Sequence, residues 1–183
     1  MNKLRLITTP YSFNGKLFEA YDDIFSMVKD DEWVCFLDGD TAFLEMANFG
    51  HLLQEYIDLY PETGMFTCYA TRCHYQGQTR KGVDPNQDSI KYFAKKVLEA
   101  KQLHPQTKPM NRRVAGHLLM LKKSTWAKIR PTLIVQARKK KILGFDTKLS
   151  NSLLHHGYDI KVMRGILIFH YLRYLTGEND LIK

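Results

Sequence analysis

The five consecutive apolar residues Trp33-Val34-Cys35-Phe36-Leu37 constrain the fold of this chain more than any other feature. An apolar run of strand length that does not alternate is typical of a strand covered on both faces by other elements. The run ends abruptly in Asp38-Gly39-Asp40, which predicts that the chain turns at solvent there. The sequence therefore predicts a layered α/β arrangement in which an acidic turn lies at the end of a buried strand.

Strand-like and helix-like segments alternate along the rest of the chain. Between 16 and 29, for example, Leu17, Tyr21, Ile24 and Phe25 recur at helical spacing. We expect helices over 16–29, 49–59, 88–102, 124–130 and 146–157, and strands over 4–9, 33–37, 65–70, 118–121, 160–163 and 166–172. We also expect loops over 76–87 and 105–109, a helix cap at Ser124, and a left-handed turn at Gly157. This alternation predicts an α/β fold with a mainly parallel sheet and helices on both faces.

Length and charge narrow the possible partners. At 183 residues the chain suits one globular domain over 1–183, and its formal charge of +8 indicates an anionic partner. The basic residues are scattered, apart from Arg112-Arg113 and the run Arg138–Lys141. Because no stripe combines basic and aromatic residues, we expect no nucleic-acid binding. A diphosphate ligand or an anionic membrane surface fits this charge better.

Cysteine usage and hydropathy bear on the compartment. The three cysteines, Cys35, Cys68 and Cys73, show no metal-ligand spacing, and their odd number argues for a reducing environment. The residues after Met1 carry no long apolar core, and no apolar stretch approaches the ~18 residues that a membrane span needs. We expect a cytoplasmic protein. The run Arg138–Lys141 is ordinarily a solvated face, but it could hold the protein peripherally at the inner face of a membrane.

The acidic pair Asp38 and Asp40 is the strongest functional feature of the sequence. Ligands of open α/β sheets bind outside the carboxyl ends of the strands, and two carboxylates placed there can hold a divalent cation. Such a cation bridges diphosphate oxygens and neutralises the charge of a leaving nucleotide. Gly39 between the two acids allows the backbone to approach a ligand closely. The alternative is a plain tight turn, since Asp and Gly are favoured turn residues.

With these residues in view, the chain resembles the family 2 glycosyltransferases of GT-A type, particularly short bacterial members. The resemblance extends from Leu6 to Arg173 and depends on the order and spacing of several landmarks. These are Thr8–Ser12, Trp33–Asp40, Thr71–Arg72, Ala115–Gly116 ahead of Leu119–Leu121, Gly144–Asp146 and Gly165–Arg173. The resemblance implies a GT-A-like, Rossmann-like fold.

The resemblance also implies roles for individual residues. Asp38 would hold the ribose or diphosphate and take part in the metal site, and Asp40 would bind the metal, Mn2+ or Mg2+. Thr9, Pro10 and Tyr11 would lie against the nucleobase. The implied reaction is an inverting transfer of one sugar from a nucleoside-diphosphate donor to a hydroxyl of a glycan or lipid-linked acceptor. The bacterial setting and a surface polysaccharide as product are implied by the resemblance alone.

His170 has a case of its own. Ile166, Ile168 and His170 share one face of an expected strand, so the imidazole continues an apolar row. The residues alone leave open a hydrogen-bonded core histidine, whereas the resemblance implies the late histidine that completes metal coordination. His155 and His156, adjacent near a helix end, diverge by about 100° and are poor joint ligands.

The catalytic base is assigned through the same resemblance. An inverting transfer needs a carboxylate to take the proton of the acceptor hydroxyl. The family places this acid in a Glu-Asp pair about a dozen residues before a Gly-aromatic dipeptide, and counting back from Gly157-Tyr158 gives Asp146. The preceding glutamate of that pair is replaced by Phe145. The alternative for Asp146 is a helix N-cap, and one residue can serve both purposes.

Two further residues receive functional predictions with open alternatives. Arg72 ends an expected strand and would meet the donor phosphate or the acceptor, although an arginine there is commonly solvated. Gly116 precedes an expected strand and would line the acceptor side, although it can equally be a simple turn.

Two other classes of function compete with the transferase. A haloacid-dehalogenase-type phosphohydrolase also places Asp-x-Asp after an apolar strand. That motif normally lies near the N-terminus, with a threonine two residues after the second acid, whereas here Thr41 follows Asp40 directly. A non-catalytic nucleotide-sugar-binding relic is the other alternative, because nothing before Leu4 matches the early acidic strand that reads the nucleobase in the family.

Overall fold

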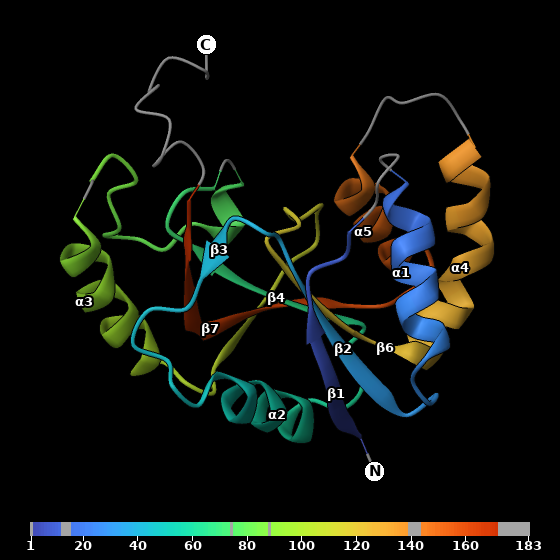
Figure 1. Cartoon of the computed structure of the whole chain (residues 1–183), viewed down its shortest axis with the longest axis horizontal. Coiled ribbons are helices and arrows are strands. Elements are labelled where there is room, and N and C mark those ends of the chain that lie inside the picture. Colours follow the sequence, from blue (N-terminus) through green and yellow to red (C-terminus); the bar gives the residue numbers. More distant parts are fainter. Residues whose placement is uncertain (1, 12–15, 74, 88, 139–143, 172–183) are drawn as a thin grey trace.

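A computed structural model of the protein describes residues 2–11, 16–73, 75–87, 89–138 and 144–171 (Figure 1). Its helices are α1 (Leu17–Ser26), α2 (Phe49–Leu59), α3 (Ile90–Lys101), α4 (Lys123–Arg138), α5 (Phe145–His155) and the short 3-10 helix η1 (Gln76–Gln78). Its strands are β1 (Lys3–Thr8), β2 (Glu32–Leu37), β3 (Thr41–Ala42), β4 (Met65–Ala70), β5 (Thr107–Pro109), β6 (Leu118–Lys122) and β7 (Ile160–His170). Lys139 to Lys141 of the basic run, Ser12 and the residues from Leu172 onward lie outside the described residues.

The strands of the described chain form a sheet in the order β1-β2-β6-β4-β7-β3, and β5 also pairs with β7. The α/β class is confirmed, but the sheet is mixed where the sequence predicted a mainly parallel one. β1 with β2 and β4 with β7 are parallel, whereas β6 runs antiparallel to both of its neighbours, β2 and β4. An apolar run indicates that a strand is buried on both faces but does not indicate its direction. The sequence pattern therefore could not show that β6 runs antiparallel to its neighbours.

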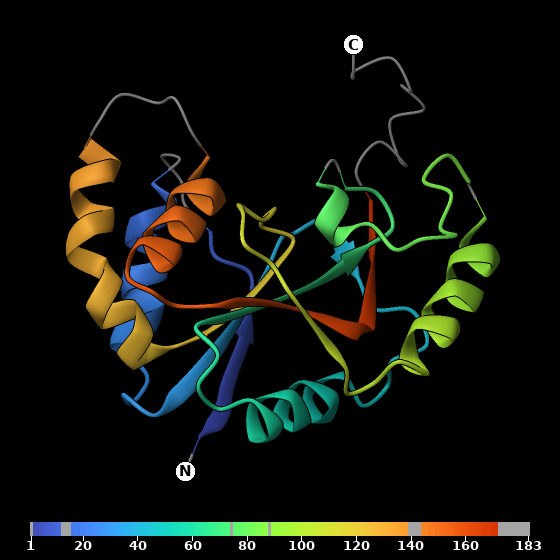
Figure 2. The same ribbon diagram turned by 180° about the vertical axis from the view of Figure 1, so that it is seen from behind.

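The helices cover the sheet from two sides. Figures 1 and 2 show α1, α4 and α5 gathered on one side of the strands, with α2 and α3 on the other. Between these layers, the residues from Trp33 to Phe36 of β2 have no exposed surface, and β4 and most of β6 are equally buried. The continuous apolar runs in the sequence are therefore explained by helices on both faces of the central strands.

Two element predictions near the carboxyl end needed correction. The expected strands over 160–163 and 166–172 are one strand, β7, whose pairing with β4 shifts register between Met163 and Leu167. The helix expected to end at 130 continues as α4 to Arg138 with Pro131 inside it, and Ser124 lies within that helix instead of capping it. A proline removes only one helical hydrogen bond, and burial of Leu133 in the core favours continuation of the helix.

Three short elements were not predicted. β3, β5 and η1 contain two or three residues each, too few for any periodic pattern to register. The left-handed turn after α5 is confirmed, because Gly157 has a φ of 78°. Within the described residues, no helix combines the length and the hydropathy that crossing a lipid bilayer requires.

Candidate functional site

The acidic segment after β2 is a hydrogen-bonded turn. The Thr41 backbone N–H and the Thr41 hydroxyl both donate to the carbonyl of Asp38, at 3.3 and 2.8 Å. The turn interpretation of this motif is therefore correct as far as the backbone is concerned. It does not exclude a ligand site, because both acidic side chains remain exposed on the turn.

The unpredicted strand β3 brings this turn to the carboxyl end of the chain's last described strand. Thr41 pairs with His170 and Ala42 with Phe169, in an antiparallel ladder. The backbone N–H of Tyr171 also donates to the carbonyl of Asp40 at 2.7 Å. Residues about 130 positions apart in the sequence thereby become direct neighbours.

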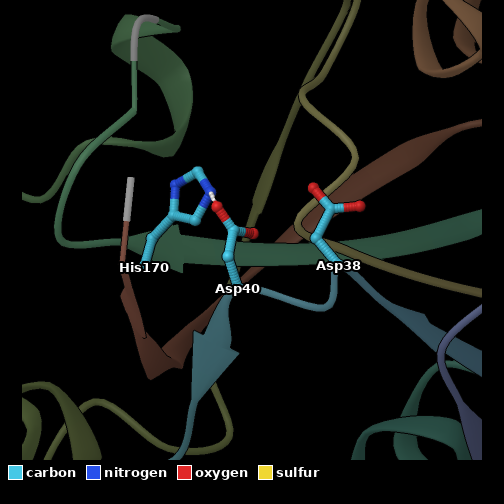
Figure 3. A group of neighbouring side chains, drawn as sticks. All are labelled: Asp38, Asp40 and His170. Atoms are coloured by element: carbon cyan, nitrogen blue, oxygen red, sulfur yellow. Dashed lines mark ion pairs between the residues drawn. The ribbon is translucent and has the colours of Figure 1, made fainter. Parts of the chain in front are cut away.

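Asp38, Asp40 and His170 converge as a result (Figure 3). Each offers a ligand atom, and these atoms lie within 4.8 Å of one another. The Nε2 atom of His170 is 3.2 Å from Oδ2 of Asp40, and Figure 3 shows Asp38 on the far side of Asp40 from the imidazole. We refer to these three residues as the triad.

The orientation of the His170 ring is set by the residues that follow β4. Nδ1 of His170 lies 2.7 Å from the backbone carbonyl of Arg72, and its backbone N–H donates to Oγ1 of Thr71 at 3.1 Å. A carbonyl can only accept, so Nδ1 must carry a proton. Nε2 then presents either a lone pair or a second proton to the Asp40 carboxylate. A lone pair facing the carboxylate is favourable only if a cation lies between them, so the arrangement suits a proton or a metal ion at this point.

A second histidine, His117, lies behind the triad. Its ring centroid is 5.8 Å from that of His170, and its backbone carbonyl accepts the N–H of Asp38 at 3.3 Å. Burial, and to a lesser degree the neighbouring His170, lowers the pKa of His117 to about 3. His117 is therefore neutral at physiological pH and does not repel a cation held by the triad.

The electrostatics of Asp38 also indicate that negative charge predominates in the site. Desolvation raises the pKa of Asp38 first, and the carboxylates of Asp40 and Asp146 raise it further, while His170 opposes them. Asp38 is exposed and lines a pocket, whose walls partly desolvate its carboxylate. Acidic groups that outnumber the opposing charges around them favour binding of a cation.

A pocket of about 310 Å³ adjoins the triad and shares Asp38 with it. The pocket contains predicted site residues from four parts of the sequence, namely Thr9, Pro10, Asp38, Gly39, Gly116 and Asp146. Asp40 and His170 do not line it. The remaining wall residues were not predicted to belong to a site, and they are Leu17, Tyr21, Leu37, Leu119, Gly144 and Phe145.

Tyr21 is the most informative of the residues that the sequence analysis missed. Its ring stacks on Phe36 with centroids 3.9 Å apart, and it contacts Phe145 at 4.6 Å. Burial and the charges of Asp38 and Asp146 raise the pKa of the Tyr21 phenol well above its usual range. Tyr21 lies on the apolar face of α1, where core residues also lie. Helical periodicity alone therefore could not distinguish a pocket residue from a core residue at this position.

Besides Asp40 and His170, two further predicted site residues, Tyr11 and Arg72, lie outside the pocket lining. Tyr11 is 77% exposed at the end of the described part of this loop. The guanidinium group of Arg72 donates to the carbonyls of Pro85 and Gln87, each at 2.9 Å, and lies over the ring of Phe93. Arg72 therefore contributes to the triad through its backbone carbonyl, while its side chain contacts the loop over 85–87.

Asp146 lies in the first turn of α5, on the wall of the pocket. The N-cap of this helix is Gly144, so the alternative that Asp146 is the cap is wrong in position. Oδ1 of Asp146 accepts the N–H of Thr147 at 2.7 Å, which still satisfies one amide at the helix start. A Cβ atom on Gly144 would lie 2.6 Å from Oδ1, so the glycine makes room for the carboxylate.

Two of the three pocket glycines, Gly39 and Gly116, are not explained by the packing of the protein itself. A Cβ atom on Gly39 would meet only Thr9, at 3.7 Å, which is an ordinary contact. On Gly116 it would lie 3.6 Å from Cβ of Asp146 and 3.7 Å from Oδ1 of Asp38, again without a clash. Neither glycine has a positive φ. The lack of a side chain at Gly116 leaves space between Asp38 and Asp146, which favours a ligand there.

Comparison with known proteins adds no family to this description. No protein-family model matches the chain, and no curated protein matches its sequence. The fold and the site therefore define only a class: an α/β protein with a mixed open sheet and a carboxylate-histidine triad beside a pocket. The chemistry must be argued from the geometry.

Proposed function

We propose that the protein is a metal-dependent glycosyltransferase that takes a nucleoside-diphosphate sugar as donor. One observation carries the proposal: Nδ1 of His170 is committed to the Arg72 carbonyl, while Nε2 faces the Asp40 carboxylate with Asp38 beside it. A carbonyl behind a ligand histidine is the usual support of a metal-binding imidazole. The GT-A-like resemblance of the sequence agrees with this reading.

The triad suits Mn2+ or Mg2+. Two carboxylates and one imidazole form a set dominated by oxygen, which favours these hard cations, and the imidazole favours Mn2+ over Mg2+. A divalent ion held there would neutralise the diphosphate as it leaves the sugar. His117 behind the triad is neutral, so it would not repel a divalent ion held there.

The pocket suits a hydroxyl-rich ligand. Among the described residues that line it, two are carboxylates and none is lysine or arginine. Carboxylates accept hydrogen bonds from hydroxyl groups, whereas a phosphate in the same place would be repelled. Apolar and aromatic walls such as Tyr21 and Phe145 suit the faces of a sugar or a nucleobase. This favours the sugar or nucleobase of a donor in the pocket, with its diphosphate at a metal held by the triad beside it.

Asp146 is the proposed base. It lies across Gly116 from Asp38, so an acceptor hydroxyl that enters over Gly116 would meet its carboxylate. Asp146 takes the proton of that hydroxyl as the oxygen attacks the anomeric carbon. The bond between the anomeric carbon and the diphosphate breaks, and its electron pair leaves with the diphosphate. Attack on the face opposite the leaving group inverts the anomeric centre.

The acceptor is proposed to be a glycan or a lipid-linked hydroxyl. The protein would then work in the cytoplasm, with peripheral contact to the inner face of the membrane through its basic run. These parts of the proposal rest on the charge and the resemblance of the sequence.

Calorimetry tests the proposal. Wild-type protein and the Asp40→Ala variant are titrated with UDP, GDP, CDP, ADP and dTDP, each with and without Mn2+. We expect at least one nucleoside diphosphate to bind wild type only with the metal, and the variant to lose that dependence. Binding of none of them at millimolar concentration would overturn the proposal. A covalent aspartyl-phosphate trapped at Asp38 with a phosphate analogue would instead establish a phosphohydrolase.

A further inference from the structure

A buried glutamine lies beneath the wall of the pocket. Gln78 ends the 3-10 helix η1, in a segment that the sequence predicted to be a surface loop, and its side chain is completely buried. Burying a primary amide is unfavourable unless its donors and acceptor are all satisfied. The prediction of a surface loop is therefore wrong at Gln78, because this side chain points into the protein.

The amide of Gln78 pairs with both backbone groups of one residue. Its Oε1 accepts the N–H of Ala115 at 2.6 Å, and its Nε2 donates to the carbonyl of Ala115 at 3.2 Å. Nε2 also donates to Oγ1 of Thr67 at 2.7 Å, whose hydroxyl in turn donates to the carbonyl of Leu118 at 2.8 Å. The Ala115 N–H fixes which end of the amide is oxygen, so every donor in this chain of hydrogen bonds is assigned.

The segment held in this way forms one side of the site. Gly116 follows Ala115 and lies between the side chains of Asp38 and Asp146. His117 comes next, accepts the backbone N–H of Asp38, and packs its ring beside His170. Nε2 of His117 is also 3.3 Å from Nε2 of Gln78. A shift of Ala115 would therefore move groups that contact two of the three triad residues.

We propose that Gln78 is a positioning residue of this site. Through its hydrogen bonds to Ala115, it fixes the position of the segment from Ala115 to His117 relative to β2 and β7. That position allows the three triad side chains to converge. Gln78 itself contacts neither the proposed metal nor the substrate. The inference rests on the proposed function, because it assigns a support to the same site.

The chain offers a matched control. Gln54 of α2 does not line the pocket and also bonds the backbone, from a half-buried position: its Oε1 accepts the N–H of Leu4 at 2.7 Å, and its Nε2 donates to the carbonyl of Asn2 at 3.1 Å and to Oδ1 of Asp58 at 2.8 Å. Replacing either glutamine by methionine removes the hydrogen bonds and keeps the length of the side chain. Both variants should lose thermal stability, but only Gln78→Met should affect the site.

The test measures Mn2+ affinity by the electron paramagnetic resonance signal of the free ion, with the thermal midpoint recorded in parallel. In Gln78→Met we expect the dissociation constant for Mn2+ to rise by about 10- to 100-fold, the range typical of lost support around a metal site. Gln54→Met should stay within about twofold of wild type. Where a nucleotide sugar turns over, Gln78→Met should lower kcat more than it raises KM.

Thr67→Val is the second variant, because it removes one acceptor of Gln78 with little change in volume. It should weaken Mn2+ binding in the same direction and by less. Unchanged Mn2+ affinity in a folded Gln78→Met or Thr67→Val, with a thermal loss like that of Gln54→Met, would overturn the inference and leave the proposed function intact. If wild type binds neither Mn2+ nor a nucleoside diphosphate, both proposals fall.

Discussion

Removing the charge of Asp38 should stabilise the metal-free protein. Burial and the nearby carboxylates raise the pKa of Asp38, so the folded state holds its proton more tightly than the unfolded state does. The stability of wild type therefore falls as pH rises from the ordinary aspartate value of about 3.9 through the raised one. The variant Asp38→Asn keeps the shape of the side chain but cannot ionise, so its stability does not fall with pH for this reason.

The size of the effect follows from the geometry of the triad. Oxygens of Asp38 and Asp40 lie within 4.8 Å. Two unit charges at that distance repel by about 0.9 kcal/mol in water and by about 3.5 kcal/mol at an effective dielectric constant of 20. Because both side chains are exposed, about 1 to 2 kcal/mol is the appropriate range. For a chain of this length that corresponds to a rise in Tm of about 2 to 8 °C.

Differential scanning fluorimetry at pH 7.5, with and without Mn2+, checks this prediction. Without metal, Asp38→Asn should melt above wild type, and the gap should close as pH falls towards 4. With Mn2+ at 100 times its dissociation constant, wild type gains about 2.7 kcal/mol and should overtake the variant. Asp58→Asn, on the exposed part of α2, is the control and should change stability by less than about 0.5 kcal/mol. A lower metal-free Tm in Asp38→Asn, or equal Mn2+ shifts in both proteins, would refute the reasoning.

Three further outcomes follow from the site and the packing around it. His170→Gln should raise the dissociation constant for Mn2+ by at least about tenfold, measured by paramagnetic resonance, and unchanged affinity would remove His170 from the ligand set. Asp146→Asn should lower kcat by at least about 100-fold while Mn2+ affinity falls much less than in His170→Gln, since the base is lost and the metal ligands remain; full activity would exclude Asp146 as the base. Gly64→Ala should lower the free energy of unfolding by about 1 to 3 kcal/mol in urea, because its Cβ would lie 2.5 Å from Cβ of Tyr158. Gly116→Ala is the comparison, with no such clash, and a similar loss in both would contradict the steric argument.

The sequence by itself determined the layers of the protein and the position of its acidic turn. An apolar run such as 33–37 can be stable only between two covering layers, and the chain can leave that layer only through polar turn residues such as Asp38 and Gly39. Helical periodicity likewise identified α1 and α2, and the glycine at 157 identified the left-handed turn that follows α5. These features depend on residues close together in the chain.

Only the tertiary structure decided which distant side chains meet. The approach of Asp40 to His170 depends on the two-residue strand β3, which is too short to carry a pattern. The burial of Gln78 depends on a backbone segment nearly forty residues away whose hydrogen bonds it satisfies. The direction of β6 depends on its neighbours, because a strand buried on both faces has the same composition in either orientation. Hydrogen bonds between remote segments leave no periodic trace in a sequence, so the residue pattern by itself could not show that these side chains meet, and only the resemblance grouped Asp38, Asp40 and His170 in advance.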